Sequence, residues 1–311
     1  MKLLKMLLSA ATCLTLCACT PNRIKTNDGQ TSSWREDEDY HTYTVDGKEY
    51  SYNSHLMNFL ITGVDTRDGD GGQSDFILLL SFDRENSQYR ILQLDRSAYV
   101  DIKIYDLEHN FLGWDKSYLA LSYAYGTSTK QSTLYTKDAV SRLLHNIPIT
   151  YYMTIALDDL SLIQDVVGPM QVEVKDDLLA EVNPEWTKGS IVTVDASNVE
   201  EFIRHRNTDI SGSNEIRMER QKEYLNTYLD ALKTLITSDF DKALDRVSDV
   251  ADRVYTNVEL TEISDILDMV IDYTFDDIYQ LPGEVVQGSF RTQFNVDEEK
   301  LPQLICDLYY D

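Results

Sequence analysis

The sequence predicts an α/β fold, a single α-β-α domain in which helices cover a mixed central β-sheet. Two observations predict this class. Short apolar runs of strand length alternate along the chain with longer segments whose apolar residues recur at helical spacing. The chain also has 311 residues and 42% hydrophobic composition, which is enough for one large domain or two small ones.

The N-terminus has the layout of a bacterial secretion signal. Two lysines and an apolar stretch lie within residues 2–16, and the stretch is shorter than a typical membrane span. The following LCAC, residues 16–19, resembles a lipobox, which predicts a signal peptide over residues 1–18 and lipid attachment at Cys19. The alternative is an uncleaved N-terminal membrane anchor. Either arrangement predicts a protein at the outer face of the cytoplasmic membrane.

Charge and cysteine content exclude several classes of function. The formal net charge is −25, and no basic patch with interleaved aromatic residues occurs, so we expect no nucleic-acid partner. With Cys13 and Cys17 removed and Cys19 lipidated, only Cys306 remains. A single thiol excludes a disulfide framework and a cysteine metal site within one mature chain. Cys306 lies in an apolar helical pattern, which predicts a buried thiol.

The first expected elements are a tether, a hairpin and three strands. Residues 19–42 are polar and predict a flexible tether. Within residues 43–56, alternating residues flank Asp46-Gly47, a strong hairpin signal. Apolar runs over Met57–Val64 and Phe76–Phe82 predict two buried strands. A third strand, Tyr89–Leu94, follows through a tight turn that predicts antiparallel pairing.

Helices and strands then interleave. Apolar spacing predicts a helix over Thr136–Ile147, which stops before a proline. A strand is expected over Tyr151–Leu157, then a short helix closed by Gly168 and a strand over Met170–Val174. Ser197 and the glutamate three residues later match a capping box that opens another helix.

The last part of the chain predicts mainly helices. An amphipathic pattern runs over residues 214–237, and further helical patterns cover 239–250 and 259–273. Val285–Phe294 alternates as a late strand, and the chain ends in a helix. Because the late strand needs a sheet to join, we expect residues 233–311 to complete the same domain.

The first candidate site is a loop that carries unusual charge. Asp65 to Asp75 holds four aspartates and three glycines between the two buried strands. Neither register of an EF-hand fits, and no Walker A motif occurs. If the strands are neighbours, Asp65 and Asp75 open at the same sheet edge. Magnesium prefers a couple of carboxylates together with substrate phosphates, so the pair predicts a phosphate-bearing ligand. The alternative is a solvated acidic loop.

The second candidate site is a group of arginines in an otherwise acidic chain. Arginine forks match phosphate geometry and keep their charge when desolvated. One pair is two residues apart and shares a face if that stretch is extended, and Arg217 shares a helix face with Gln221. The alternative is surface salt bridging with nearby acids, which are Asp209, Glu215 and Glu219. The arginines are Arg204, Arg206, Arg217 and Arg220.

Together these segments resemble the LytR-CpsA-Psr family of cell-wall glycopolymer transferases. The matching pieces occur in the family's order over about residues 57–232, which would form the catalytic core. They are NFLITGVDTR…GGQSDF, LQLDRSAYVDI, LALSYAYG, IPITYYMTIALDDL, EEFIRHR and EIRMERQKEYL.

The resemblance implies an α/β fold with an apolar tunnel for a polyprenyl chain. It implies transfer of a polyprenyl-pyrophosphate-linked glycan onto peptidoglycan, with Mg²⁺ held by Asp65 and Asp75. Substrate contacts are also implied for Arg67, Gln73 and Arg220. The residues implied to bind the pyrophosphate are Arg96, Arg204, Arg206, Arg217 and Gln221.

Two positions depart from the family's pattern. Gln73 stands where the family usually has an arginine, and Ser97 stands where it usually has an aspartate. The family usually has a transmembrane anchor, whereas a lipid anchor is suggested here. These departures keep two alternatives open. The chain could be a catalytically impaired lipoprotein that binds polyprenyl phosphates or wall polymer, or its arginines could only bridge acids. His205, between two of the arginines, is expected to be a spacer that points away.

Overall fold

The computed structural model describes residues 40–65, 72–210, 212–288 and 291–311. The chain divides into two compact units, Met1–Glu38 and Asp39–Asp311, and all described residues lie in the second. The expected signal peptide, Cys19 and Arg67 therefore lie outside the described residues. Within the described part of the chain, no helix has both the length and the apolar character needed to cross a membrane.

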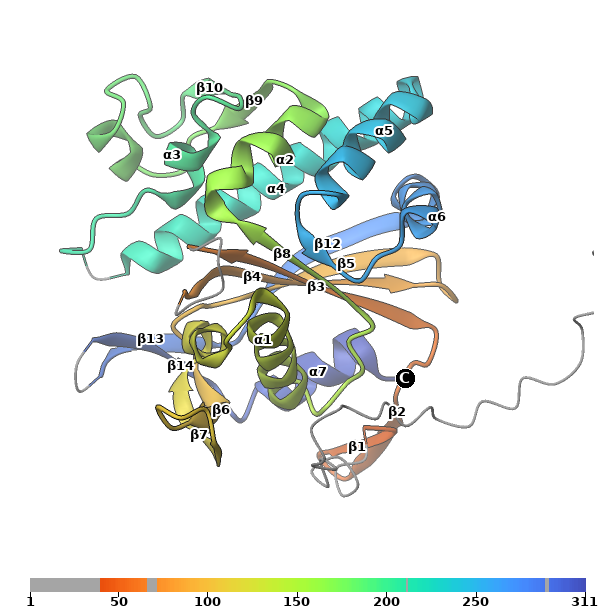
Figure 1. Ribbon diagram of the computed structural model, residues 1–311, viewed down its shortest axis with the longest axis vertical. Helices are drawn as coiled ribbons and strands as arrows, with labels where there is room; N and C mark the ends of the chain where they lie inside the picture. The colour runs from red at the N-terminus through yellow and green to blue at the C-terminus, as the bar shows by residue number, and fades with distance from the viewer. Residues whose placement is uncertain (1–39, 66–71, 211, 289–290) are drawn as a thin grey trace, which may run out of the picture. The chain divides into compact units, whose positions relative to one another are not determined.

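A six-stranded mixed sheet forms the centre of the domain (Figure 1). Its three middle strands are antiparallel neighbours, whereas β8 runs parallel to β3 and β12 runs parallel to β5. This sheet with helices on both sides confirms the predicted fold class. In sheet order the strands are β11 (Tyr255–Thr256), β8 (Tyr151–Ala156), β3 (Leu56–Val64), β4 (Ser74–Asp83), β5 (Gln88–Leu94) and β12 (Thr274–Gln280).

The middle strands are apolar along most of their length because both sheet faces are covered. Successive side chains point to opposite faces, so Phe59 and Leu60 enter different core clusters. Leu78 and Leu79 on β4 likewise enter different core clusters. The apolar runs predicted as buried strands are therefore confirmed, with sheet faces that pack on separate helical layers.

One face packs on α1 (Thr129–Leu143) and α7 (Leu301–Tyr309), whose Val140 and Leu308 join the cluster around Leu60. Helix α1 begins at Thr129 rather than at Thr136, because Ser128 caps it by accepting a hydrogen bond from the backbone of Gln131. Cys306 on α7 is a buried free thiol, as predicted.

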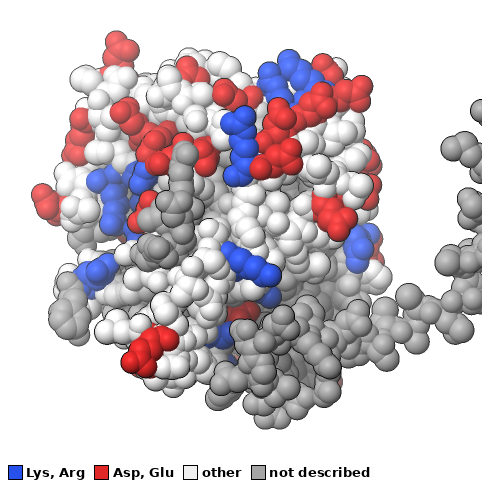
Figure 2. Space-filling view, in the orientation of Figure 1, with Lys and Arg blue, Asp and Glu red and all other residues white. Residues whose placement is uncertain are grey.

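The other face packs on a second layer of helices (Figure 1). Ile236, Ala243 and Leu267, from three of these helices, join the core cluster that contains Phe59 and Phe82. Figure 2 shows that acidic side chains gather over this helical layer. The helices are α2 (Leu160–Val167), α4 (Ser213–Ser238), α5 (Phe240–Ala251) and α6 (Leu260–Asp272).

Beside α4 lies a smaller cluster formed by β9 (Met170–Glu173), β10 (Ile191–Val194) and α3 (Val199–Arg204). The capping box predicted at the start of α3 does not form. Ser197 donates its hydroxyl to Asp195 at 2.6 Å, so the helix begins one residue later than expected.

Among the described residues, four two-stranded sheets lie outside the central sheet. The predicted N-terminal hairpin is confirmed by β1 (Thr42–Val45) and β2 (Lys48–Ser51). A second hairpin consists of β6 (Tyr99–Tyr105) and β7 (Phe111–Tyr118).

The predicted late strand is instead a third hairpin, β13 (Gly283–Gln287) with β14 (Thr292–Val296). It forms its own two-stranded sheet, and the strand that joins the central sheet is β12, which the sequence pattern did not predict. Asp311 exchanges backbone hydrogen bonds of 2.9 and 3.0 Å with Ser51, the last residue of β2.

Candidate functional site

The topology of the sheet gathers the candidate residues at one end. The last residue of β3, Val64, pairs with the first residue of β4, Ser74, and the end of β5 lies beside them. One or two residues after these three strand ends come Asp65, Asp75 and Arg96, respectively. The fold therefore brings the two predicted acids and a predicted arginine to the same sheet edge.

Arg96 connects the residues at this edge. Its Nη1 lies 2.7 Å from Oδ1 of Asp75, and its Nη2 donates to Oε1 of Gln73 at 2.5 Å. Burial lowers the pKa of Arg96 most, the charge of Asp75 raises it, Arg206 lowers it and Asp65 raises it. Both predicted acids and a second predicted arginine thus act on one guanidinium group.

The backbone fixes Asp65 across the acidic loop. Oδ1 of Asp65 accepts a hydrogen bond of 2.7 Å from the backbone N–H of Gln73. The N–H of Asp65 in turn donates to the carbonyl of Gln73 at 3.3 Å. These bonds hold Asp65 close to the start of β4, where Asp75 lies.

The donor set at this edge fits a magnesium ion. Asp65 and Asp75 each use one carboxylate oxygen in the contacts above, which leaves the second oxygen of each for a cation. No cluster of three or more histidine, cysteine or acidic side chains suited to a metal occurs among the described residues. Two carboxylates match magnesium, which keeps waters and shares phosphate oxygens, better than a metal that needs a full set of protein ligands.

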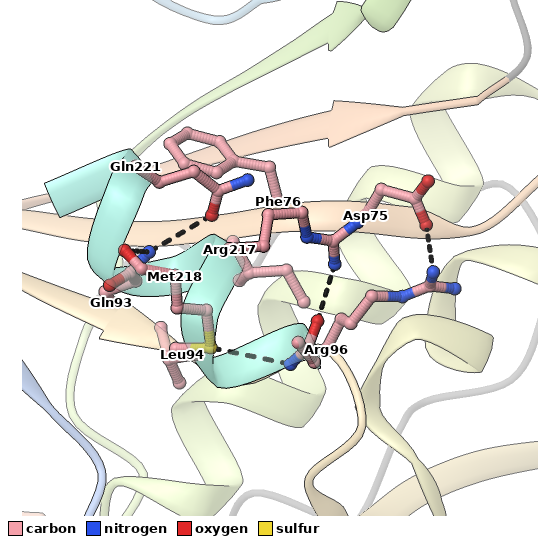
Figure 3. A pocket seen from close by; sticks show the side chains of 10 residues that line it. Asp75, Phe76, Gln93, Leu94, Arg96, Arg217, Met218 and Gln221 are labelled. Carbon is pink, nitrogen blue, oxygen red and sulfur yellow. Dashed lines mark hydrogen bonds and ion pairs between the residues drawn. The ribbon is translucent and has the colours of Figure 1, made fainter. Parts of the chain in front are cut away.

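Arg217 approaches the same edge from α4. Its side chain is 5% exposed, and Nη2 donates to Oδ1 of Asn214 at 2.6 Å, while Nε is buried without a hydrogen-bond partner. Burial, Arg206 and Arg96, in that order, lower the pKa of Arg217 to about 10. Figure 3 shows the Arg217 and Arg96 guanidinium groups beside Asp75. Arg217 therefore stays charged at neutral pH although its closest partner is a neutral amide.

A chain of hydrogen bonds orients Arg217. Asn214, which contacts Arg217, donates through Nδ2 to Oδ2 of the buried Asp95 at 2.8 Å. The other oxygen of Asp95 accepts the backbone N–H and the hydroxyl of Ser97, both at 2.6 Å. The sequence prediction did not include Asp95 or Asn214. The family usually has an aspartate at the position of Ser97. Asp95, two residues earlier, supplies a buried carboxylate here.

Gln221 lies on the same face of α4 as Arg217, as predicted. Its Oε1 accepts a hydrogen bond of 3.2 Å from Gln93 on β5, and its Nε2 donates to the carbonyl of Ile203 at 3.2 Å. Gln221 thus joins the end of α3 to the sheet. Together with Arg217, it lines a narrow cavity between α4 and the sheet (Figure 3).

A larger cleft of about 380 Å³ opens on the other side of Arg96. Arg206 lies in its wall, and within the described part of the chain this arginine has no hydrogen bond or ion pair. Glu215, Arg291 and the hairpin residue Val285 also line the cleft. An opening lined by three arginines and two acids therefore adjoins the acids at the sheet edge.

Comparison with known proteins places this arrangement in a family. The family model described as the LytR_cpsA_psr family matches residues 23–305. The chain belongs to the LytR_cpsA_psr family. This membership confirms the resemblance found in the sequence motifs.

Relatives with known names and structures agree with this assignment. The chain is 24% identical over 278 residues to the polyisoprenyl-teichoic acid–peptidoglycan teichoic acid transferase TagT of Bacillus subtilis (strain 168), covering 85% of this chain and 79% of that protein. Protein gbs0355 of Streptococcus agalactiae has the same fold, with a TM-score of 0.64, 21% identity, and coverage of 82% and 88% of the two chains. The family protein YwtF (TagT) with bound octaprenyl pyrophosphate lipid gives a TM-score of 0.58 at 19% identity, covering 84% and 92%.

Two arginines of the LytR_cpsA_psr motifs lie elsewhere than the sequence suggested. Arg204 is the last residue of α3, so it shares no extended stretch with Arg206, and it forms an ion pair with Glu200 one turn earlier. Arg220 is fully buried, and Nε and Nη2 donate to the two oxygens of Asp176 at 2.8 and 2.9 Å.

The remaining donors of Arg220 support the loop that carries Arg206. Its Nη1 donates to the carbonyls of Phe202 and His205 at 3.0 and 2.8 Å. Arg220 therefore supports this loop from within the protein, and its predicted substrate contact stays a prediction. His205 contacts Glu181 through Nε2 at 3.1 Å, in agreement with its prediction as a spacer.

The narrow cavity between α4 and the sheet is the place nearest to the expected apolar tunnel. Phe76, Leu94 and Met218 line it beside Arg217, and it is too narrow to hold a water molecule. Farther along α4, Leu225 and Leu229 pack on the buried strand residues Leu78 and Ile91. Helix and sheet thus form a closed seam here, with apolar residues beside polar ones, and the expected apolar tunnel stays a prediction.

Proposed function

We propose that this protein is an extracytoplasmic phosphotransferase that attaches a polyprenyl-pyrophosphate-linked glycopolymer to peptidoglycan. The observation that carries the proposal is the convergence of Arg96, Arg206 and Arg217 beside Asp65 and Asp75. The names of the relatives support the same reaction class, because they are teichoic acid transferases and one of them binds octaprenyl pyrophosphate.

The charges at the sheet edge suit a diphosphate. Arg206 lowers the pKa of both Arg96 and Arg217, so the three cations repel one another in the free protein. A diphosphate would remove this repulsion and accept charge-assisted hydrogen bonds from guanidinium groups. Arg217 Nε, which is buried without a partner, would gain one. The site therefore gains most from a ligand with concentrated negative charge.

Asp65 and Asp75 would hold Mg²⁺ through the carboxylate oxygens that Gln73 and Arg96 leave unused. When bound, the ion supplies Lewis-acid neutralisation of phosphate charge. The protein's own contribution is electrostatic. Arg96 and Arg217, fixed by Asp75 and Asn214, would stabilise the charge that develops on the departing phosphate. Phosphoryl transfer depends largely on such positioning and charge stabilisation.

The polyprenyl chain would enter the seam between α4 and the sheet. Phe76 and Met218 lie next to Arg217, so an apolar chain attached to a diphosphate on Arg217 would meet them first. The seam is closed, which means that lipid binding requires these side chains to move apart. A shift of this kind is a population change driven by the ligand's own binding energy.

The N-terminus would keep the enzyme near this membrane-bound donor. We propose lipid attachment at Cys19, with an uncleaved N-terminal anchor as the alternative. Cys19→Ala expressed in a bacterium should move from the membrane fraction to the soluble fraction if Cys19 is lipidated. Unchanged membrane association would favour the anchor.

The reaction is tested with the full chain, a synthetic polyprenyl-pyrophosphate glycan, magnesium and a peptidoglycan acceptor. We expect release of polyprenyl phosphate together with glycan attached to the acceptor, loss of both products after chelation, and recovery when magnesium is restored. Asp75→Asn should abolish release.

One observation favours a binding protein without turnover. Gln73 occupies a donor of Arg96 where the family usually has a further cation. Tight binding of the lipid-linked glycan without any release of polyprenyl phosphate would favour this second function.

A further inference from the structure

Glu215 is a carboxylate that the contacts described so far leave unexplained. It lies in the first turn of α4, and both of its carboxylate oxygens are buried without a hydrogen-bond partner in the described structure. Buried polar atoms in folded proteins almost always have a partner, so one that lacks it calls for a specific explanation. An absent ligand that donates a hydrogen bond would provide one.

The side chain of Glu215 lines the 380 Å³ cleft rather than the narrow cavity. Three arginines share that wall, yet in the residues that the structure describes Glu215 forms no ion pair with any of them. Its carboxylate therefore has no partner at the cleft wall, and a group that enters the cleft would reach the two buried oxygens by displacing the atoms that cover them. A volume of this size is within the range of small-molecule sites. The three arginines are Arg96, Arg206 and Arg291.

The cleft adjoins the proposed diphosphate site. Arg96 and Asn214 line both the cleft and the narrow cavity, so they form the wall between the two spaces. Glu215 follows Asn214 directly and lies on the cleft side, whereas Arg217 lies on the other side. A hydroxyl group bound at Glu215 would therefore be a neighbour of a phosphate bound at Arg96.

We propose that Glu215 binds the attacking hydroxyl group of the acceptor sugar and takes its proton. This inference rests on the proposed phosphotransferase function. The hydroxyl oxygen forms a bond to the phosphorus that carries the glycan, and the bond from that phosphorus to the bridging oxygen breaks. Polyprenyl phosphate leaves with the bridging oxygen, and the proton passes to a carboxylate oxygen of Glu215.

The surroundings of Glu215 suit a proton acceptor. Burial raises the pKa of Glu215 most, the proximity of its own backbone N–H, which forms no hydrogen bond with it, lowers it, and the charge of Asp95 raises it, with a net increase. The other charged groups that line the cleft are Arg96, Arg206, Asp209 and Arg291. A carboxylate with a raised pKa is a stronger base, which favours general-base catalysis.

The test compares Glu215→Gln with Glu219→Gln, a matched change one turn farther along α4 at an exposed glutamate outside both cavities. Three quantities are measured in the full chain: folding by circular dichroism, affinity for the polyprenyl-pyrophosphate glycan, and the rate of transfer to the acceptor against pH. Glu215→Gln should fold, bind the donor like the wild type and lose about 10²–10⁴-fold in kcat. The limb of the pH profile that rises from acid pH should also disappear. Glu219→Gln should match the wild type.

Chemical rescue gives a second, independent measurement. Glu215→Ala leaves space for a small carboxylate, so added formate should restore part of the transfer rate and leave Glu219→Ala unaffected. Full activity of Glu215→Gln would overturn the inference alone. Loss of donor binding in that variant, or no rescue by formate, would also overturn the proton-transfer role. An inactive wild type would overturn the proposed function and this inference together, which distinguishes the two failures.

Discussion

The side-chain oxygen of Gln73 accepts a hydrogen bond of 2.5 Å from Nη2 of Arg96, whose Nη1 lies 2.7 Å from Asp75. The neutral side-chain amide of Gln73 therefore helps to orient Arg96. Where the family usually has a further cation, this chain has a residue that fixes the cation already present. At position 73 the chain therefore lacks one positive charge and has instead a hydrogen-bond acceptor that orients Arg96.

Gln73→Ala tests this exchange. A hydrogen bond to a charged group contributes about 1.5–3 kcal/mol, so affinity for a soluble prenyl pyrophosphate should fall about tenfold or more. Titration calorimetry measures the change. Gln303→Ala on the exposed surface of α7, where Gln303 donates a hydrogen bond to Asp307, is the control. Equal affinity in both variants would show that Gln73 does not support the site.

Arg217 and Arg204 should behave differently. Arg217→Ala should lower prenyl pyrophosphate affinity by at least about thirtyfold, because losing a partner from a buried charged contact costs about 2–5 kcal/mol. Arg204 is paired on the surface, and exposed pairs contribute about 0–1 kcal/mol, so Arg204→Ala should change affinity by less than about fivefold. Equal losses in the two variants would restore Arg204 to the predicted pyrophosphate site.

Asp95→Asn tests the chain of bonds that orients Arg217. Asp95 accepts three hydrogen bonds, whereas the new amide nitrogen would face another donor at Ser97 or at Asn214. We expect a loss of about 1–3 kcal/mol in the free energy of unfolding, together with weaker prenyl pyrophosphate binding.

The matched control for Asp95 is Asp195→Asn. Asp195 makes the same turn, accepting the N–H and hydroxyl of Ser197 at 2.8 and 2.6 Å, but at an exposed place away from the site. The control should leave binding unchanged. If Asp95→Asn weakens stability and not binding, its role is structural alone.

Arg220→Ala should be the most destabilising of these variants. It leaves Asp176 buried without its ion-pair partner, which costs about 3–5 kcal/mol in the free energy of unfolding, measured with urea. Lys116→Ala, which breaks an exposed pair with Glu298, should cost less than about 1 kcal/mol. Normal stability with lost pyrophosphate binding would instead support the sequence prediction that Arg220 contacts substrate.

Periodicity predicted most of the fold, and the omissions have physical causes. The middle strands were predictable because both of their faces are buried. Strand β12 was not, because a bulge lies between Phe275 and Ile278 and exposed Asp276 and Asp277 stand within it. An edge strand with one fully buried side chain gives no alternating signal. The sequence predicts one strand in place of the late hairpin, because the two arms of the hairpin share one alternating pattern around Gly288.

The candidate site was predicted in part. Family motifs indicated a set of residues that line two adjoining cavities, namely Asp75, Arg96, Arg206, Arg217 and Gln221. They also indicated Asp65, which lies at the same sheet edge and contacts Gln73. Spacing could not show that Arg220, three residues after Arg217 on the same helix, faces Asp176 instead. Asp95 was detectable in principle as a polar residue directly after a buried strand. The sequence indicates Glu215 only as a surface partner for arginines, because burial of its oxygens depends on residues distant in sequence.

The pairing of β12 with β5 has a consequence for folding. The strand that leads to Arg96 is bordered by a strand that lies far downstream in the sequence, and Asp311 likewise pairs with Ser51 near the other end of the described chain. Such distant pairing is slow, because the entropy cost of closing the intervening loop precedes the gain from the contacts. The sheet edge that carries Arg96 is therefore completed late in folding.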